Sequence, residues 1–299
     1  TEGLSIFLVD MREAVGKVIF GQESVVERTL VALLAGGHAL LVGVPGLAKT
    51  KLVETLGIVL GLDARRIQFT PDLMPSDILG SEVMEQDEAG KRSFRFIPGP
   101  VFAQLLMADE INRASPRTQS ALLQAMQEYH VTVAGDRYDL PAPFHVLATQ
   151  NPLEQEGTYP LPEAQLDRFL LKIDILYPEL EAERRILLET TGVEEAKAVN
   201  VTPPERLRDI QTLIRRMPVP ESVVDTDKHV AWGPGPRASQ ALMLCTRARA
   251  LYDGRLAPSV DDVRALAEPV LQHRMALTFA ARAEGTTVRD VVAKLAKAI

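Results

Sequence analysis

Residues 38–50 have the sequence HALLVGVPGLAKT, in which a short apolar run leads into a glycine-containing turn that ends in Lys49 and Thr50. The apolar run predicts a buried strand, and the pattern after the turn predicts a helix over residues 49–60. A strand, a glycine-containing turn and a helix follow one another in this order in a phosphate-binding P-loop. The segment therefore predicts a nucleotide site in an α/β fold.

The residues of this turn have distinct expected parts in binding phosphate. Gly43 and Gly46 let backbone N–H groups turn inward around phosphate oxygens, and the helix N-terminus adds its dipole. Lys49 would contact the β- and γ-phosphates, and the Thr50 hydroxyl would join the shell of Mg²⁺. Glycine usually precedes this lysine, and the methyl group of Ala48 is compatible with the loop if that residue has a negative φ. The expected phosphate-binding residues are Gly43, Val44, Pro45, Gly46, Leu47, Ala48, Lys49 and Thr50.

The two halves of the chain have different patterns. Residues 1–176 alternate short apolar runs with helical segments, which predicts a mostly parallel sheet with helices on its faces. The expected strands are residues 38–42, 66–69, 104–108, 145–149 and 170–173. After residue 177 the patterns are helical, at residues 179–190, 204–217, 236–251 and 259–276. We therefore expect an α/β domain at 1–176 and an all-helical domain at 177–299.

Two segments of the first half interrupt this alternation. Residues 81–96 and 130–138 each place strand-like residues on both sides of a turn that contains glycine. This arrangement predicts two β-hairpins inserted into the α/β domain.

Polar side chains follow two of the expected strands. Asp109 and Glu110 come directly after the apolar run at 104–108. Asp109 could hold Mg²⁺ through water, and Glu110 could orient and polarise a water that attacks phosphate. The amide of Asn151 after the next strand could reach the γ-phosphate or that water, although an Asn-Pro pair also favours a simple turn. Together with the P-loop, the acidic pair indicates a site that hydrolyses nucleotides.

Two arginines lie near expected helix ends. Arg168 follows a short helix before the last strand, and Arg237 lies in the first turn of a helix in the second half. The helix dipole disfavours a cation at the position of Arg237. Taken alone, each also fits an ordinary surface or ion-paired arginine.

In this order, the P-loop, the acidic pair, Asn151, Arg168 and Arg237 resemble the motifs of an AAA+ ATPase. The sequences of these motifs resemble even more closely those of the MoxR branch, in which an alanine before the P-loop lysine is typical. The matching stretches are GVPGLAKT at 43–50, ADEINRA at 108–114, ATQNP at 148–152 and LDRF at 166–169. The resemblance extends from residues 20–23 to the C-terminal helices.

The resemblance implies an αβα nucleotide-binding core and a helical lid, with Mg²⁺ and ATP bound between them. Asn151 would be sensor 1, Arg237 sensor 2 in the lid, and Arg168 the arginine finger offered to a neighbouring subunit. Arg113 and Arg117 remain alternatives for the finger.

Further parts of the site follow from the same resemblance. The adenine pocket would be lined by Val18, Ile19, Phe20 and Gly21. Residues 81–96 would be the helix-2 insert, and residues 130–138 the pre-sensor-1 hairpin. A polar residue at the end of the second strand, either Gln68 or Thr70, would restrain Glu110.

The function that the resemblance implies is that of a ring, a hexamer in this family, which hydrolyses ATP and remodels or activates a protein client. MoxR proteins generally work with partners that contain a von Willebrand factor A domain. The alternatives are a motor subunit of a magnesium- or cobalt-chelatase complex, a DNA-acting motor, and a nucleotide-gated binding module without turnover. Glu110 and Asn151 disfavour the module, because both suit hydrolysis.

Composition adds limits on partners and location. The chain has 299 residues, 46% of them apolar and 24% charged, which excludes disorder of the whole chain. Lys+Arg 33 against Asp+Glu 40 gives a net charge of −7, which disfavours nucleic acid as a partner. The apolar stretch at 30–44 is too short to cross a bilayer, so we expect no direct membrane contact. The single Cys245 cannot form an internal disulfide, which favours a core position and a cytoplasmic location.

Overall fold

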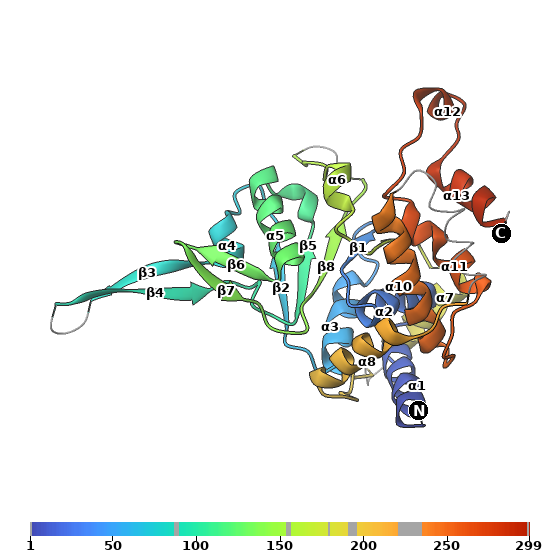
Figure 1. Ribbon diagram of the computed structural model, residues 1–299, viewed down its shortest axis with the longest axis horizontal. Helices are drawn as coiled ribbons and strands as arrows, with labels where there is room; N and C mark the ends of the chain where they lie inside the picture. Colours follow the sequence, from blue (N-terminus) through green and yellow to red (C-terminus); the bar gives the residue numbers. More distant parts are fainter. Residues whose placement is uncertain are drawn as a thin grey trace.

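The fold is built on a central parallel sheet, seen here in a computed structural model that describes residues 2–86, 90–153, 157–178, 180–190, 196–220, 235–297 and 299. Its five strands lie in the order β2-β5-β8-β1-β9 (Figure 1). They are β1 (Ala39–Val42), β2 (Ala64–Gln68), β5 (Leu105–Asp109), β8 (His145–Gln150) and β9 (Leu171–Asp174). The five expected strands are thus confirmed, with ends that differ by at most two residues, and so is the α/β class.

The two faces of the sheet bury different apolar clusters, because alternate residues of a strand point to opposite faces. Leu41 of β1 belongs to the cluster on one face, and Leu40 belongs to the cluster on the other. In β5 the same alternation separates Met107 from Leu106. The edge strand β2 carries exposed arginines, as suits a strand that pairs on one side only.

Helices of the first half cover both faces of this sheet. Residues of α1 (Glu2–Gly16), α2 (Glu23–Leu34) and α3 (Lys49–Val59) enter the cluster that contains Leu41. Residues of α4 (Pro75–Leu79) and α5 (Pro116–Glu128) enter the cluster that contains Leu40. The sequence patterns did not predict α1.

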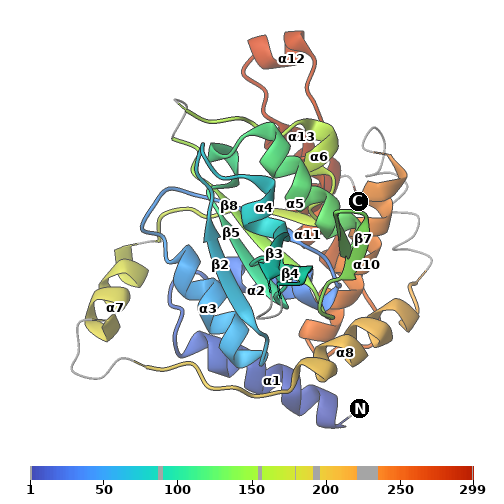
Figure 2. The ribbon, with the colours of Figure 1, turned by 90° about the vertical axis from the view of Figure 1, so that its left-hand side faces the viewer.

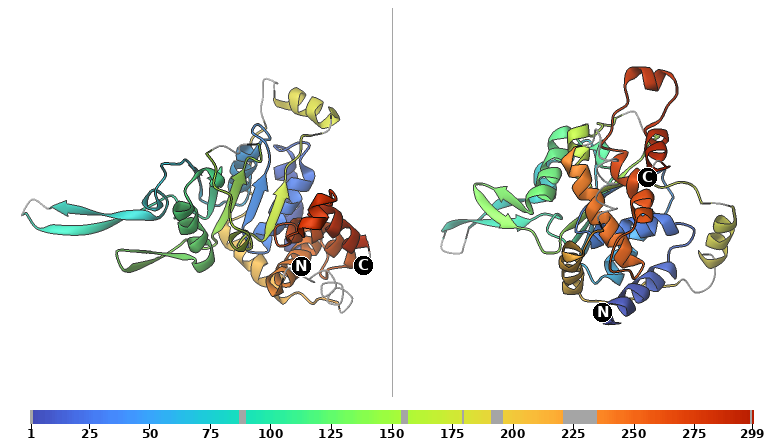
Figure 3. Two further views of the ribbon diagram at one scale, coloured as in Figure 1. Left: turned by 90° about the horizontal axis from the view of Figure 1, so that it is seen from above. Right: turned by 45° about the vertical axis from the view of Figure 1, so that its right-hand side comes forward.

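Two hairpins project from the side of the molecule opposite to the lid (Figures 1 and 3). The longer one consists of β3 (Gly80–Gln86) and β4 (Arg92–Pro98), and the shorter one of β6 (His130–Val133) and β7 (Asp136–Asp139). The rings of Phe96 and Tyr138 stack between them, with centroids 3.9 Å apart. Both expected hairpins are confirmed, and this stack joins them.

The described part of the second half contains helices and no strand. They are α7 (Leu180–Thr190), α8 (Pro204–Arg216), α10 (Pro236–Tyr252), α11 (Val260–Leu271), α12 (Phe279–Ala283) and α13 (Val288–Lys297). The helix expected at 259–276 is too long, since α11 ends at Leu271. The side chains of His273 and Arg274, which follow α11, bond to the carbonyl of Phe169 in the core. The Gly-Pro turn at 233–236 lies partly outside the described residues.

The apolar core continues across the expected boundary at 176/177. Leu207 of α8, Leu242 of α10 and Leu266 of α11 belong to the same cluster as Leu30 of α2. Cys245 is fully buried in this cluster, as expected. In contrast, α7 lies apart from α8 at the side of the molecule (Figure 2). The two-domain division remains a prediction, and the two halves share one core.

Three buried histidines lie near the starts of β1 and β8 and after α11. His38 Nδ1 accepts the Val146 N–H at 2.9 Å, His145 Nδ1 lies 2.8 Å from the Gly37 carbonyl, and His273 Nε2 lies 2.9 Å from that of Phe169. Burial lowers the pKa of His38 to about 3, that of His145 to about 4 and that of His273 to about 3. All three are therefore neutral in the folded chain at pH 6 to 7.

We expect stability to fall as the pH decreases below about 6.5, because the unfolded chain then binds protons that the folded chain excludes. The three histidines together predict a loss of about 2 kcal/mol in the free energy of unfolding between pH 7 and pH 6. Urea unfolding at both pH values measures this loss. Replacing His145 with glutamine should reduce the pH dependence by about a third, and an unchanged dependence would contradict its assignment.

Candidate nucleotide-binding site

The carboxyl ends of three neighbouring strands gather the predicted phosphate-binding and hydrolytic residues. The P-loop follows β1, Asp109 and Glu110 end β5, and Asn151 follows β8, which lies between β1 and β5. In open α/β sheets this edge is the usual place for a ligand. The fold therefore brings these three parts together.

The P-loop has the backbone of a tight turn that opens a helix. Gly46 has a φ of +85°, and a Cβ on Gly43 would lie only 2.9 Å from the Cβ of Ile175. Ala48 has a φ of +56° and ends this turn directly before α3. The condition of a negative φ at Ala48 is therefore not met, and the loop holds an alanine in the left-handed conformation. A side chain in that conformation costs about 1–2 kcal/mol.

Lys49 and Thr50 open α3 at the position where phosphate would lie. The Lys49 ammonium group donates to the Gly43 carbonyl of its own loop at 2.5 Å. Burial lowers the pKa of Lys49, and the charges of Asp109 and Glu110 oppose this shift, which places the ammonium group near both carboxylates. The Thr50 hydroxyl and the Asp109 carboxylate are the hard oxygen ligands that Mg²⁺ prefers. These groups fit a magnesium nucleotide.

Thr149 joins the two acidic residues. Its hydroxyl donates to Asp109 Oδ1 at 2.5 Å and accepts the Glu110 N–H at 2.9 Å. Thr149 is fully buried, and Glu110 has a φ of +54°. The hydroxyl thus holds the carboxylate of Asp109 and the backbone of Glu110. Sequence reasoning missed this role, and its only signal was a polar residue near the end of an otherwise apolar strand.

Glu110 is held by two further side chains. Its Oε2 accepts from Gln68 Nε2 at 2.8 Å and from Arg113 Nη1 at 3.3 Å. Of the two candidates, Gln68 is the one that contacts Glu110, since the Thr70 side chain bonds to Asp72 instead. Arg113 thus contacts Glu110 of its own chain, and the identity of the finger remains a prediction.

Asn151 lies in a turn at the end of β8. Its side chain is 5% exposed, and its Oδ1 accepts the Leu153 N–H at 3.1 Å. The simple-turn interpretation is therefore correct for the amide oxygen. The amide nitrogen is the donor that could meet a phosphate, and the sensor role remains a prediction.

A cavity lies beside the end of β9, and the adenine pocket itself remains a prediction. The cavity is lined by Gly21 and Asp174 of the first half, and by Tyr177, Glu268 and Arg289 of the second half. Asp174 ends β9 in register with Val42, next to the P-loop. Among the four expected adenine-pocket residues, Gly21 lines this cavity.

The other three expected adenine-pocket residues lie elsewhere. Val18 is buried in the core, and Phe20 is half-buried. Ile19 is also buried, and it lines a second cavity that contains Arg12 and Tyr252. The first of these cavities is the one that α11 and α13 also line, through Glu268 and Arg289.

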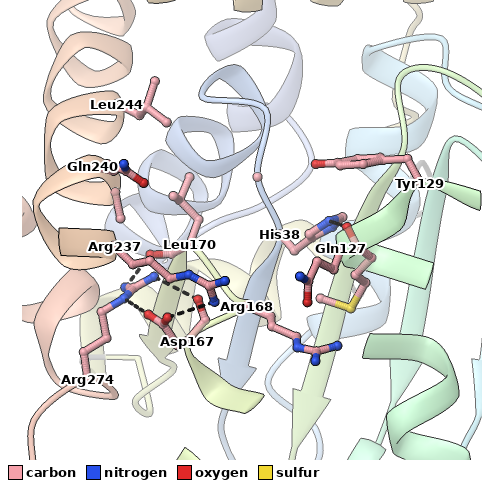
Figure 4. A pocket seen from close by; sticks show the side chains of 13 residues that line it. His38, Gln127, Tyr129, Asp167, Arg168, Leu170, Arg237, Gln240, Leu244 and Arg274 are labelled. Carbon is pink, nitrogen blue, oxygen red and sulfur yellow. Dashed lines mark hydrogen bonds and ion pairs between the residues drawn. The ribbon is translucent and has the colours of Figure 1, made fainter. Parts of the chain in front are cut away.

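Arg168 and Arg237 lie together at the opposite edge of the sheet (Figure 4). The pocket that they line includes His38, which precedes β1, and Leu170, which precedes β9. A four-residue strand spans roughly 13 Å, so a P-loop of the same chain is beyond their reach. Arg237 therefore lies away from the P-loop of its own chain, and its role as sensor 2 remains a prediction.

Asp167 holds two arginines of the second half, Arg237 and Arg274. It accepts from Arg237 Nη1 at 3.2 Å and from Arg274 Nε at 2.7 Å, as the dashed lines in Figure 4 show. Arg274 is 3% exposed and also donates to the carbonyls of Leu170 and Phe169. The side chain of Arg168 has no hydrogen bond or ion pair with the described residues, so its guanidinium group can meet a partner.

The described ranges contain neither a cluster of metal ligands nor a membrane-spanning helix. They contain no group of three or more His, Cys, Asp or Glu arranged to hold a metal ion. None of their helices combines the length and apolar composition that crossing a membrane requires.

Comparisons with known proteins agree with this geometry. Residues 38–171 match the ATPase family associated with various cellular activities (AAA), and residues 224–295 match the AAA lid domain. The chain is 41% identical to Chaperone MoxR1 of Mycobacterium tuberculosis, with 100% of this chain and 84% of that protein covered. It is 30% identical to Protein MoxR of Paracoccus denitrificans, covering 90% of this chain and 88% of that one.

A solved structure is similar over the whole chain. It is the crystal structure of an ATPase candidate from Cytophaga hutchinsonii, with a TM-score of 0.90 and 36% sequence identity. The match covers 100% of this chain and 96% of that one.

Proposed function

The chain belongs to the MoxR family of AAA ATPases, and we propose that it hydrolyses ATP with Mg²⁺ in a ring, as a chaperone-like remodeller of a protein client. The observation that carries this proposal is the split of the site between two edges of the sheet. The P-loop and the acidic pair lie at one edge, and Arg168 and Arg237 lie at the other. A complete site then needs two chains.

In the proposed mechanism, each group of the P-loop edge has one task. Lys49 and the N–H groups of residues 43–50 bind the phosphates, while Glu110 orients and polarises the attacking water. Thr50 and Asp109 would hold Mg²⁺, which neutralises phosphate charge when it is bound. The amide of Asn151 would align the γ-phosphate with the water.

The neighbouring subunit supplies the remaining positive charge. Arg168 would approach the γ-phosphate as a finger, and Arg237 would act beside it from the lid of the same neighbour. Donors aimed at developing negative charge are among the strongest catalytic effects. Because the two edges differ, the contact is heterologous and closes into a ring, which we propose to be a hexamer.

The hairpin β3–β4 is the part that we propose for the client. Met84 and Phe94 face each other across its strands and are 56% and 70% exposed. Large exposed apolar side chains suit contact with another protein. A partner with a von Willebrand factor A domain and a cytoplasmic location belong to the same proposal and rest on the family and the single cysteine.

The shared site can be tested by mixing two inactive variants. Glu110→Gln lacks the water-polarising carboxylate, and Arg168→Ala lacks the finger. In random mixed rings, about a quarter of the interfaces combine an intact Glu110 with an intact Arg168 from its neighbour. We therefore expect phosphate release to recover to roughly a quarter of the wild-type rate.

A control mixture uses two variants of the same edge. Glu110→Gln and Lys49→Ala cannot complement each other, because one chain must provide both groups to a site. Equal rates for the control mixture and the test mixture would refute a site shared between subunits. Recovery that required a chelatase complex would instead favour the chelatase-type motor.

A further inference from the structure

Arg66 lies on β2, the outermost strand of the sheet, and contacts Asp109 of the acidic pair. Its Nη2 donates to Asp109 Oδ2 at 2.6 Å and to Gln68 Oε1 at 3.2 Å. The amide of Gln68 in turn donates to Glu110 at 2.8 Å. One guanidinium group therefore bonds both to the carboxylate expected to hold Mg²⁺ and to the side chain that holds Glu110.

The contact with Gln68 also sets the direction of its amide. With Oε1 accepting from Arg66, the Nε2 group is the one that faces Glu110. Without the guanidinium group, the amide could rotate and present its oxygen to the Glu110 carboxylate, which would repel it. Arg66 is therefore placed to strengthen the hold of Gln68 on Glu110.

The neighbouring arginine shows that this placement is specific. Arg65 has a similarly exposed side chain, 47% against 50% for Arg66, but it pairs with Asp63 at 3.7 Å. Successive residues of a strand point to opposite faces, so only one of the two reaches Asp109. Arg65 provides a matched control on the same strand.

We propose that Arg66 is a positioning residue that couples metal binding to the release of Glu110; this inference rests on the proposed function. A bound metal would compete with Arg66 for the Asp109 carboxylate, because both are cations attracted to the same negative charge. Without the contact to Asp109, the bond from Arg66 to Gln68 would weaken. Glu110 is then free to orient water only in a site that holds metal.

The competition can be measured without hydrolysis. Mn²⁺ is titrated into the ADP-saturated full-length chain, and free Mn²⁺ is followed by electron paramagnetic resonance. Arg66→Met removes the competing charge and should tighten Mn²⁺ binding by roughly threefold to fivefold, the range of an exposed ion pair. Arg65→Met should bind Mn²⁺ as the wild type does.

The outcomes separate this inference from the proposed function. Equal Mn²⁺ affinities for Arg66→Met and Arg65→Met would contradict the proposed competition, but they would not contradict the proposed ATP hydrolysis. Asp109→Asn should weaken Mn²⁺ binding in every background, and its failure to do so would contradict the proposed metal site itself.

A second measurement tests the link to Gln68. If Arg66 acts on Glu110 through Gln68, Arg66→Met and Gln68→Leu should each raise ATP turnover at low Mg²⁺. The double variant should then not exceed Arg66→Met, because Gln68→Leu breaks a contact that Arg66→Met has already weakened. Additive effects would overturn the link.

Discussion

Replacement of Glu110 by glutamine is expected to lower the rate of ATP turnover by about 100-fold or more, while ATP still binds. A neutral amide is a poor base and polarises water weakly, whereas the P-loop and Lys49 are unchanged. The glutamine oxygen can still accept from Gln68, which now lies 2.8 Å from Glu110 Oε2, so the local fold should persist. Phosphate release measures the rate, and a fluorescent ATP analogue measures binding.

The control for this variant is Glu205→Gln. Glu205 is exposed in the first turn of α8, outside the site, and its replacement should leave turnover unchanged. Turnover of Glu110→Gln at the wild-type rate would contradict the assignment of Glu110. Loss of ATP binding in this variant would instead point to a damaged P-loop.

Replacement of Asp262 by alanine is expected to lower the free energy of unfolding by about 3–5 kcal/mol. Asp262 is fully buried, and its carboxylate accepts from Arg249 at 2.7 Å, from Arg255 at 2.6 Å and from the Ser259 N–H at 2.7 Å. Burial alone would raise the pKa of Asp262, but hydrogen bonds from Arg255, Ser259 and Arg249 lower it. Without the carboxylate, two guanidinium groups lose their shared buried partner.

This network also attaches the lid to the core. Arg249 of α10 donates to Glu27 of α2 at 2.8 Å, so Asp262 of α11 is connected to the first half through one arginine. We expect Asp262→Ala to loosen the contact between these helices as well as to lower the unfolding temperature.

Chemical unfolding of two adjacent variants checks this prediction. Asp261 is 82% exposed and pairs with Arg264 at 3.1 Å, so Asp261→Ala should change stability by less than about 1 kcal/mol. Equal stabilities for the Asp261 and Asp262 variants would show that the buried network contributes little.

Much of the fold and part of the site followed from local pattern. The strands at 38–42 and 104–108 could be predicted because a buried parallel strand needs a continuous apolar run, and most of their residues are buried. The P-loop and the acidic pair could be predicted because each is a short stretch whose residues act together. The hairpins followed from residues close in the chain.

Other parts required the arrangement of the chain in space. Thr149 bonds to Asp109 across 40 positions of the chain, and Arg66 reaches it across 43. No local pattern indicates such pairs, because the strand order brings them together. The left-handed conformation of Ala48 was missed because an alanine rarely adopts it, and the loop geometry overrides that preference.

Local sequence was enough to predict the residues proposed to bind phosphate and activate water, because these groups lie on adjacent residues at strand ends. Local patterns did not show where Arg168 and Arg237 lie relative to the P-loop, and only the resemblance implied that Arg168 serves a neighbouring subunit. The parallel sheet places Arg168, which precedes β9, and the P-loop, which follows β1, at opposite ends of the strands. Chain direction through the sheet, and not residue type, separates Arg168 from the P-loop of its own chain, which is the basis of the proposal that it serves a neighbour.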